Sequence, residues 1–265
     1  MKLTENIRDI LQQYKSCSPA ILSKLARILM NGKLAGTGKL VILPVDQGFE
    51  HGPDKSFAKN PESYDPNYHI KLAIDGGVSA YAAPLGFLAS CDPIYLAEIP
   101  TILKINSGNL LYPKSEAPNQ SVNASVKDAI QLGCVAIGLT IYPGSAKSYD
   151  MIEEARELVR EASSHGIASV IWSYPRGGDI SKDGETAIDI CAYAAHIAAL
   201  LGAHIIKVKP PTKFVEQAEI SKLYDSQNLD FSSLENRIAH VKKSCFAGRR
   251  MVVFSGGASK EKSEL

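Results

Sequence analysis

Long apolar runs are missing from this sequence of 265 residues. No stretch holds the roughly eighteen consecutive apolar residues that a membrane-spanning helix requires. The opening segment, MKLTENIRDILQQYKS, carries charges throughout and has no apolar core of the kind found in signal peptides. We therefore expect a cytoplasmic protein with no membrane partner.

An excess of charge of either sign is also missing. Twenty-nine basic residues face twenty-eight acidic ones, which gives a net charge of +1. A nucleic-acid-binding surface normally needs a clear basic excess, and so does binding to an anionic membrane. The balance provides no such surface, so we expect neither nucleic acid nor a membrane as partner and favour a small molecule.

Cysteine is scarce, and no C-x-x-C pair is present. The five cysteines are widely spaced and odd in number, which fits reduced thiols better than disulfides or a zinc site. No G-x-G-x-x-G follows the first apolar run, so the sequence lacks the usual dinucleotide-binding signature.

Short apolar runs of strand length recur along the chain instead. Segments with helical periodicity lie between them, most clearly 145–166 and 184–202, and this alternation predicts parallel strands joined by helices. The predicted strands cover residues 39–46, 78–84, 101–106, 134–141, 168–174, 204–210 and 250–257.

Nearly continuous apolar strands indicate a sheet covered on both faces, either a doubly wound open sheet or a closed (β/α)8 TIM barrel. A barrel would gather the carboxyl ends of its strands around one mouth, whereas an open sheet would spread them along an edge. We favour a single-domain TIM barrel over residues 36–265, preceded by a helical arm in residues 1–35. The strand ends that carry reactive or polar side chains are Asp46, Asn106, Tyr174, Lys207 and Ser255.

Two features of this organisation stand apart. Residues 47–77, rich in glycine and proline, predict a long loop over the mouth. Eight strands close a TIM barrel, but only seven are visible before the sequence ends. We therefore expect that an eighth β/α unit is missing from this chain.

The strand HIIKVKPP, residues 204–211, carries two lysines. Side chains alternate along a strand, so Lys207 and Lys209 share a face. Lys209, nearer the end, is expected to extend its ammonium into solvent. Lys207 lies one layer deeper beside a second cation. Burial and like charge lower the pKa of such an amine and make it a nucleophile toward carbonyls, which predicts a Schiff-base lysine.

The segment WSYPRGG, residues 172–178, places an aromatic pair at the end of the fifth strand. Trp172 and Tyr174 share a face, and on their own they would suit an apolar core equally well. Facing a lysine, the Tyr174 hydroxyl could transfer protons, while the guanidinium of Arg176 could hold a phosphate through paired donors.

Two further segments follow strand ends. SGG at 255–257 fits an ordinary turn, but in barrels the loop after the seventh strand commonly holds phosphate. DQGFEHGP at 46–53 begins with Asp46, which could be catalytic or could cap the loop. Glu50 and His51 are adjacent rather than spaced for one metal, so we expect no metal cofactor.

Four segments in this order, LPVDQGFEHGP, WSYPRGG, GAHIIKVK and FSGG, resemble the archaeal-type class I fructose-1,6-bisphosphate aldolases, a family also found in bacteria. The resemblance runs from about residue 33 to residue 257. It implies a metal-independent lyase of glycolysis and gluconeogenesis. Such an enzyme cleaves fructose 1,6-bisphosphate reversibly to dihydroxyacetone phosphate and glyceraldehyde 3-phosphate, and homo-oligomers are common among these barrels.

The resemblance also implies roles for individual residues. Lys207 would form the Schiff base, Tyr174 would transfer protons, Asp46 would orient hydroxyls and Trp172 would shape the wall. The 6-phosphate would bind to Arg176, and the 1-phosphate to Ser255, Gly256 and Gly257. Further candidates for substrate binding are His51, Lys209 and Asn106.

Two alternatives remain open at this stage. Schiff-base chemistry transfers between carbonyl substrates, so a related transaldolase-like or thiolase-like enzyme acting on another sugar phosphate fits the same residues. A barrel that binds a sugar phosphate without turnover is the second alternative.

Overall fold

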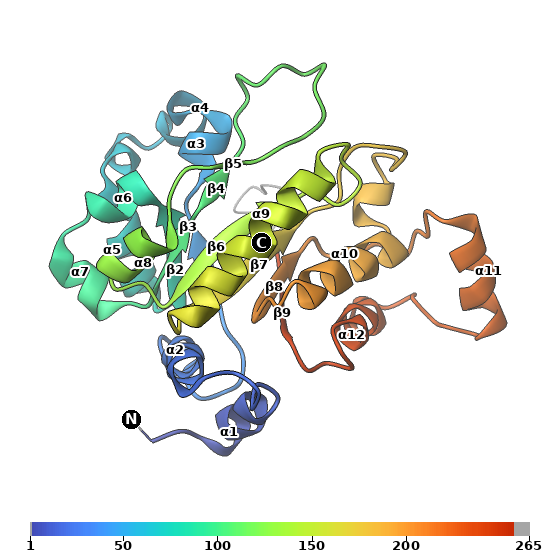
Figure 1. The fold of residues 1–265 in the computed structure, drawn as a ribbon, viewed down its shortest axis with the longest axis horizontal. Helices are drawn as coiled ribbons and strands as arrows, with labels where there is room; N and C mark the ends of the chain where they lie inside the picture. The colour runs from blue at the N-terminus through green and yellow to red at the C-terminus, as the bar shows by residue number, and fades with distance from the viewer. Residues whose placement is uncertain (1, 257–265) are drawn as a thin grey trace.

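The structure is a computed structural model that describes residues 2–256. All seven predicted strands are confirmed, and they form one parallel sheet in the order β1-β2-β3-β6-β7-β8-β9 (Figure 1). The bounds are β1 Ile42–Pro44, β2 Ala80–Pro84, β3 Thr101–Lys104, β6 Ala136–Ile141, β7 Ala168–Ser173, β8 Ile205–Val208 and β9 Met251–Phe254.

Helices cover the outer face of this sheet. The longest, α9 (Ser148–Ser164) and α10 (Ile188–Leu200), confirm the two helical segments that the sequence predicted most clearly. The others are α5 (Pro66–Gly76), α6 (Leu85–Ala89), α7 (Pro93–Glu98), α8 (Val126–Gln131), α11 (Ala218–Ser226) and α12 (Leu234–Ser244). Strand and helix alternate along the chain, which is the arrangement of an α/β barrel.

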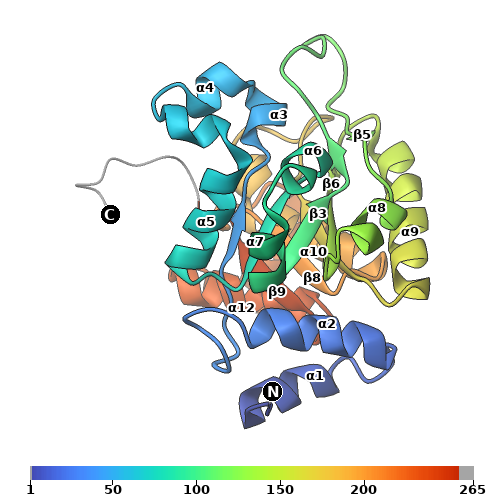
Figure 2. The ribbon, with the colours of Figure 1, turned by 90° about the vertical axis from the view of Figure 1, so that its left-hand side faces the viewer.

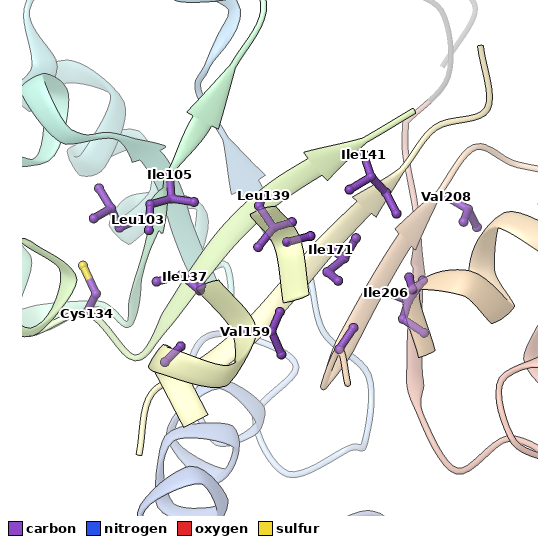
Figure 3. Close-up of a cluster of buried hydrophobic side chains, with 14 of the residues drawn as sticks. Leu103, Ile105, Cys134, Ile137, Leu139, Ile141, Val159, Ile171, Ile206 and Val208 are labelled. Carbon is purple, nitrogen blue, oxygen red and sulfur yellow. The ribbon is translucent and has the colours of Figure 1, made fainter. Parts of the chain in front are cut away.

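The two faces of each strand enter different cores. In β6, Ile137, Leu139 and Ile141 point outward and pack with α9, as Figure 3 shows. Ala136, in the same strand, belongs to the inner core together with Val170 of β7. Because side chains alternate, the inner strands of the sheet bury both faces, which explains their nearly continuous apolar runs, while the edge strands β1 and β9 are half-buried.

One glycine makes room for the largest side chain of the inner face. A Cβ on Gly138 would lie 2.3 Å from the Trp172 ring, closer than real contacts allow. The absence of a side chain in β6 therefore permits the indole of β7 to lie across the inside of the sheet.

The N-terminal arm forms two helices, α1 (Glu5–Gln12) and α2 (Pro19–Leu29), whose first turns are capped by Thr4 and Ser18. They lie at the opposite end of the sheet from α3 and α4 (Figure 2). In the link between α1 and α2, the Tyr14 hydroxyl donates to the His204 carbonyl (2.7 Å) and accepts from the Met251 N–H (2.7 Å). The arm is thus hydrogen-bonded to the starts of β8 and β9.

The connection after Asp46 was predicted as a long loop, and this was wrong in part. It contains α3 (Gln47–His51), α4 (Pro53–Phe57), the 3-10 helix η1 (Pro61–Tyr64) and the whole of α5. Phe57 is buried and packs against the rings of Tyr64 and Phe87. Helices of one or two turns are too short to show a period of 3.6 in the sequence.

A small ladder escaped sequence analysis altogether. Strands β4 (Asn106–Ser107) and β5 (Ser121–Val122) pair antiparallel and hold residues 108–120 as a loop that rises above the carboxyl ends of the sheet (Figure 1). Ser145 Oγ donates to the Pro118 carbonyl and fixes the returning side of this loop.

Strands β1 and β9 form the two edges of the sheet, and within residues 2–256 no strand pairs with their outer sides. A cleft of about 620 Å³ lies between them, lined by residues of both strands together with Tyr14, Trp172 and Lys207. All five cysteines are free, as expected. Among the described residues, no helix has both the length and the apolar character needed to cross a bilayer.

Candidate active site

Lys207 lies on the inner face of β8, in register with Trp172 of β7 and Val253 of β9. Its Nζ lies 5.3 Å from the centroid of the Trp172 ring, a cation–π distance. The amine is half-buried at the carboxyl end of a barrel strand, where catalytic groups of this architecture gather.

A second lysine, which sequence analysis missed, approaches the same ring. Lys104 of β3 is only 1% exposed, and its Nζ lies 5.9 Å from the Trp172 centroid. The ammonium donates to the backbone carbonyl and, at 3.4 Å, to the side-chain oxygen of Asn106. Lysine is almost never fully buried without a partner, so its place in the apolar strand TILKIN was the available signal.

Two carboxyl groups act on these amines from the start of α3. Asp46 occupies the N-cap position of that helix, yet its side chain makes no capping hydrogen bond. Burial, followed by the negative charge of Asp46, raises the pKa of Glu50. The site therefore combines two amines and two carboxyl groups in largely dry surroundings, where charges interact strongly.

Burial lowers the pKa of Lys207, and the positive charge of Lys104 lowers it further, while Asp46 and Glu50 oppose the shift. The sequence suggested Lys209 as the second cation, and this was wrong. Lys209 lies beyond the end of β8 and pairs with Glu185 (Nζ to Oε2 2.6 Å). The like charge comes instead from Lys104 of β3, whose Nζ approaches the same Trp172 ring.

Tyr174 follows β7 directly and packs against both cores. Burial and then the charges of Asp46 and Glu50 raise the pKa of its hydroxyl. The phenol therefore carries its proton at neutral pH. Trp172 is buried, and among residues 2–256 its Nε1 has no hydrogen-bond partner.

Arg176 lies over the ring of Tyr142, with 4.8 Å from its guanidinium carbon to the ring centroid. The loop that carries it needs glycine. Gly177 and Gly178 have φ values of +77° and +61°, and a Cβ on Gly178 would lie 2.4 Å from the Gly144 carbonyl oxygen. This tight turn presents the guanidinium beside Glu50, on whose pKa it acts.

The predicted 1-phosphate segment follows β9. The Ser255 N–H donates to the Val208 carbonyl (2.9 Å), and Gly256 is exposed and lines the same cleft as Lys207. Gly257 lies outside the described residues.

The remaining candidate substrate-binding residues differ in what they contact. His51 is exposed at the end of α3. The Asn106 amide is committed to the protein, since its Nδ2 donates to the Thr140 carbonyl (2.8 Å) and its Oδ1 accepts from the Thr140 N–H (2.7 Å). Asn106 thus fixes Lys104 rather than facing outward. In residues 2–256, no three His, Cys, Asp or Glu residues are grouped as metal ligands.

Comparison with known proteins places this site in context. The family described as DeoC/LacD family aldolase matches residues 40–265. A probable fructose-bisphosphate aldolase class 1 of Chlamydia muridarum is 35% identical over 92% of this chain and 72% of its own length. The fructose-bisphosphate aldolase class 1 of Thermoproteus tenax is 42% identical over 66% of this chain.

Solved structures agree. An archaeal fructose-1,6-bisphosphate aldolase, with its catalytic lysine covalently bound to the carbinolamine intermediate of the substrate, is 33% identical with a TM-score of 0.72, covering 92% of this chain and 83% of that one. The chain spans 72% of the length of the Chlamydia relative and 64% of the Thermoproteus one.

Proposed function

The chain belongs to the DeoC/LacD family of aldolases, and from this premise we propose that it is a class I fructose-1,6-bisphosphate aldolase acting through a Schiff base on Lys207. One observation carries the proposal. A half-buried amine with a lowered pKa lies among carboxyl groups at the carboxyl end of a barrel strand, in a chain similar to a protein whose catalytic lysine holds a carbinolamine.

The first step is attack of the neutral Lys207 amine on the C2 ketone of the open-chain sugar, which forms a carbinolamine. Protonation of its hydroxyl releases water and leaves an iminium. Tyr174, protonated at neutral pH, supports this step as the proton donor.

The second step breaks the bond between C3 and C4. The iminium accepts the electron pair and becomes an enamine, while the C4 hydroxyl loses its proton and becomes the aldehyde. Tyr174, left as a phenolate when it protonated the carbinolamine hydroxyl, takes that proton and becomes neutral again, since its raised pKa makes the phenolate a strong base. Reprotonation at C3 and hydrolysis release dihydroxyacetone phosphate and restore the lysine.

The phosphates bind at opposite ends of this arrangement. We assign the 6-phosphate to Arg176, and the 1-phosphate to the segment of Ser255, Gly256 and Gly257. Support for the first comes from the position of Arg176 beside Glu50, and for the second from the cleft that Gly256 shares with Lys207. Neither step requires a metal ion.

Larger-scale features are also proposals. We propose an eighth strand at the gap between β1 and β9, since barrels of this type close with eight.

Five free cysteines suit a reducing cytoplasm. The exposed Tyr149 on α9 and the exposed Tyr193 and Leu200 on α10 support assembly as a homo-oligomer.

The test is a coupled assay for dihydroxyacetone phosphate release from fructose 1,6-bisphosphate. We expect cleavage that is unaffected by a chelator, and a loss of at least about a thousandfold in kcat for Lys207→Met. The matched control is Lys71→Met, which removes an exposed lysine on α5. Cleavage of other sugar phosphates but not this one would favour the transaldolase-like alternative, and binding without turnover would favour the non-catalytic one.

A further inference from the structure

A further cavity is lined by Arg176 and Glu50. Its volume is about 340 Å³, and the β4–β5 loop forms one wall. We name it the distal pocket and define it by Ser107, Gln120, Tyr142, Arg176 and Glu50. Glu50 links it to the reaction centre, because this carboxyl group also acts on the pKa of Lys207.

Two polar atoms in this wall are buried without a partner among the described residues. They are the hydroxyl of Ser107, which is 1% exposed, and the carbonyl oxygen of the Gln120 amide, which is 4% exposed. A buried polar atom without a hydrogen bond typically costs about 1–3 kcal/mol, so a native protein rarely keeps two in one wall without a use.

The rest of the wall orients these atoms. Gln120 Nε2 donates to the Tyr142 hydroxyl at 2.6 Å, which holds one end of the amide and leaves its oxygen as a free acceptor. Ser107 is held in the ladder opposite Ser121. The lining of one cavity thus holds an acceptor oxygen and a hydroxyl, and these match an O–H group of a ligand, since only a donor can satisfy the Gln120 oxygen.

Charge defines the other part of the ligand. The Arg176 guanidinium and the Lys114 ammonium both belong to the lining, and either can bind a phosphate. The acidic groups of the lining are Glu50 and Glu116. Burial raises the pKa of Glu50, which reduces its repulsion of an anion.

From this wall we propose that the distal pocket binds the phosphorylated aldehyde half of the substrate and selects for its hydroxyl group through Ser107 and Gln120. The inference rests on the proposed function for the identity of the reaction. It adds the two residues that distinguish a hydroxylated aldehyde phosphate from a deoxy one.

The test uses equilibrium binding, so that turnover is not needed. Calorimetry compares glycerol 3-phosphate with 3-hydroxypropyl phosphate, which lacks the middle hydroxyl, on the full chain. We expect the wild-type protein to bind the first about tenfold more tightly, a typical effect of satisfying a buried polar group. In Ser107→Ala this preference should fall to about twofold or less, with binding of the deoxy phosphate retained.

Ser107→Ala removes a buried hydroxyl that makes no hydrogen bond among the described residues, so its denaturation midpoint should equal or exceed that of the wild type. Gln120→Leu provides a second variant, and Ser164→Ala, an exposed serine on α9, is the control. An unchanged preference in both pocket variants, or none in the wild type, would overturn the proposal. If the protein prefers glycerol 3-phosphate but does not cleave fructose 1,6-bisphosphate, the result would contradict the proposed function and leave the binding proposal intact.

Discussion

At the scale of single residues, the charge state of Lys207 decides whether it can act, because only the neutral amine attacks a carbonyl. The groups that face it are Lys104 from β3, and Asp46 and Glu50 at the start of α3. Of these, only Lys104 favours the neutral form. Its burial and its hydrogen bonds to Asn106 hold the ammonium in place, so it acts as a positioning residue.

Replacing Lys104 by methionine should therefore raise the pKa of Lys207, since a like charge is removed and the two carboxyl groups remain. The rising acid limb of kcat/KM follows the appearance of the neutral amine. It should move to higher pH. The measurement is a pH–rate profile, supported by the pH dependence of Lys207 acetylation with trace acetic anhydride.

Lys71→Met is the matched control, because it removes one lysine charge at the surface of α5. A Lys104→Met profile that falls in height without moving along the pH axis would assign Lys104 a purely structural role. The acetylation measurement distinguishes this result from a general loss of active protein, because it reports the pKa of Lys207 without requiring catalysis.

At the scale of elements, the site depends on how strands and helices are brought into register. Gly138 in β6 lets the Trp172 ring of β7 lie across the inner face, and both amines approach that ring. At the other end of the sheet, the arm of α1 and α2 is attached through Tyr14. Its hydroxyl bonds to backbone groups of His204 and Met251, which lie at the starts of β8 and β9.

Removing this hydroxyl by Tyr14→Phe should destabilise the fold by about 1–3 kcal/mol, because it leaves a buried carbonyl and a buried N–H without partners. Tyr14 is only 1% exposed. The check is the midpoint of urea denaturation at unchanged slope. Tyr149→Phe on α9, where the side chain is 81% exposed, serves as control. Equal midpoints for the two variants would show that the arm does not contribute through this contact.

At the scale of the whole molecule, sequence patterns predicted what depends on local periodicity. The seven strands were visible because each is a short apolar run, buried on both faces inside the sheet and half-buried at its edges, and Lys207 was visible as a charge inside such a run. The short helices α3 and α4 were not, since five residues cannot show a helical period.

Residues that work through distant contacts were also missed. Lys104 becomes significant only when β3 and β7 come together around Trp172, and Gln120 only when its loop folds back onto Tyr142. Both contacts depend on which segments become neighbours in the folded chain, and a single sequence does not specify this. The assignment of Lys209 as the neighbouring cation failed for the same reason, since its partner is Glu185 from a different segment.

The central claim is that Lys207 forms a Schiff base, and reductive trapping tests it most directly. The protein is incubated with dihydroxyacetone phosphate, reduced with sodium borohydride and mapped by peptide mass spectrometry. We expect a single reduced adduct on Lys207, absent without reductant and absent from Lys207→Met. An adduct on Lys104 instead, or none in a protein that still cleaves the substrate, would contradict the account.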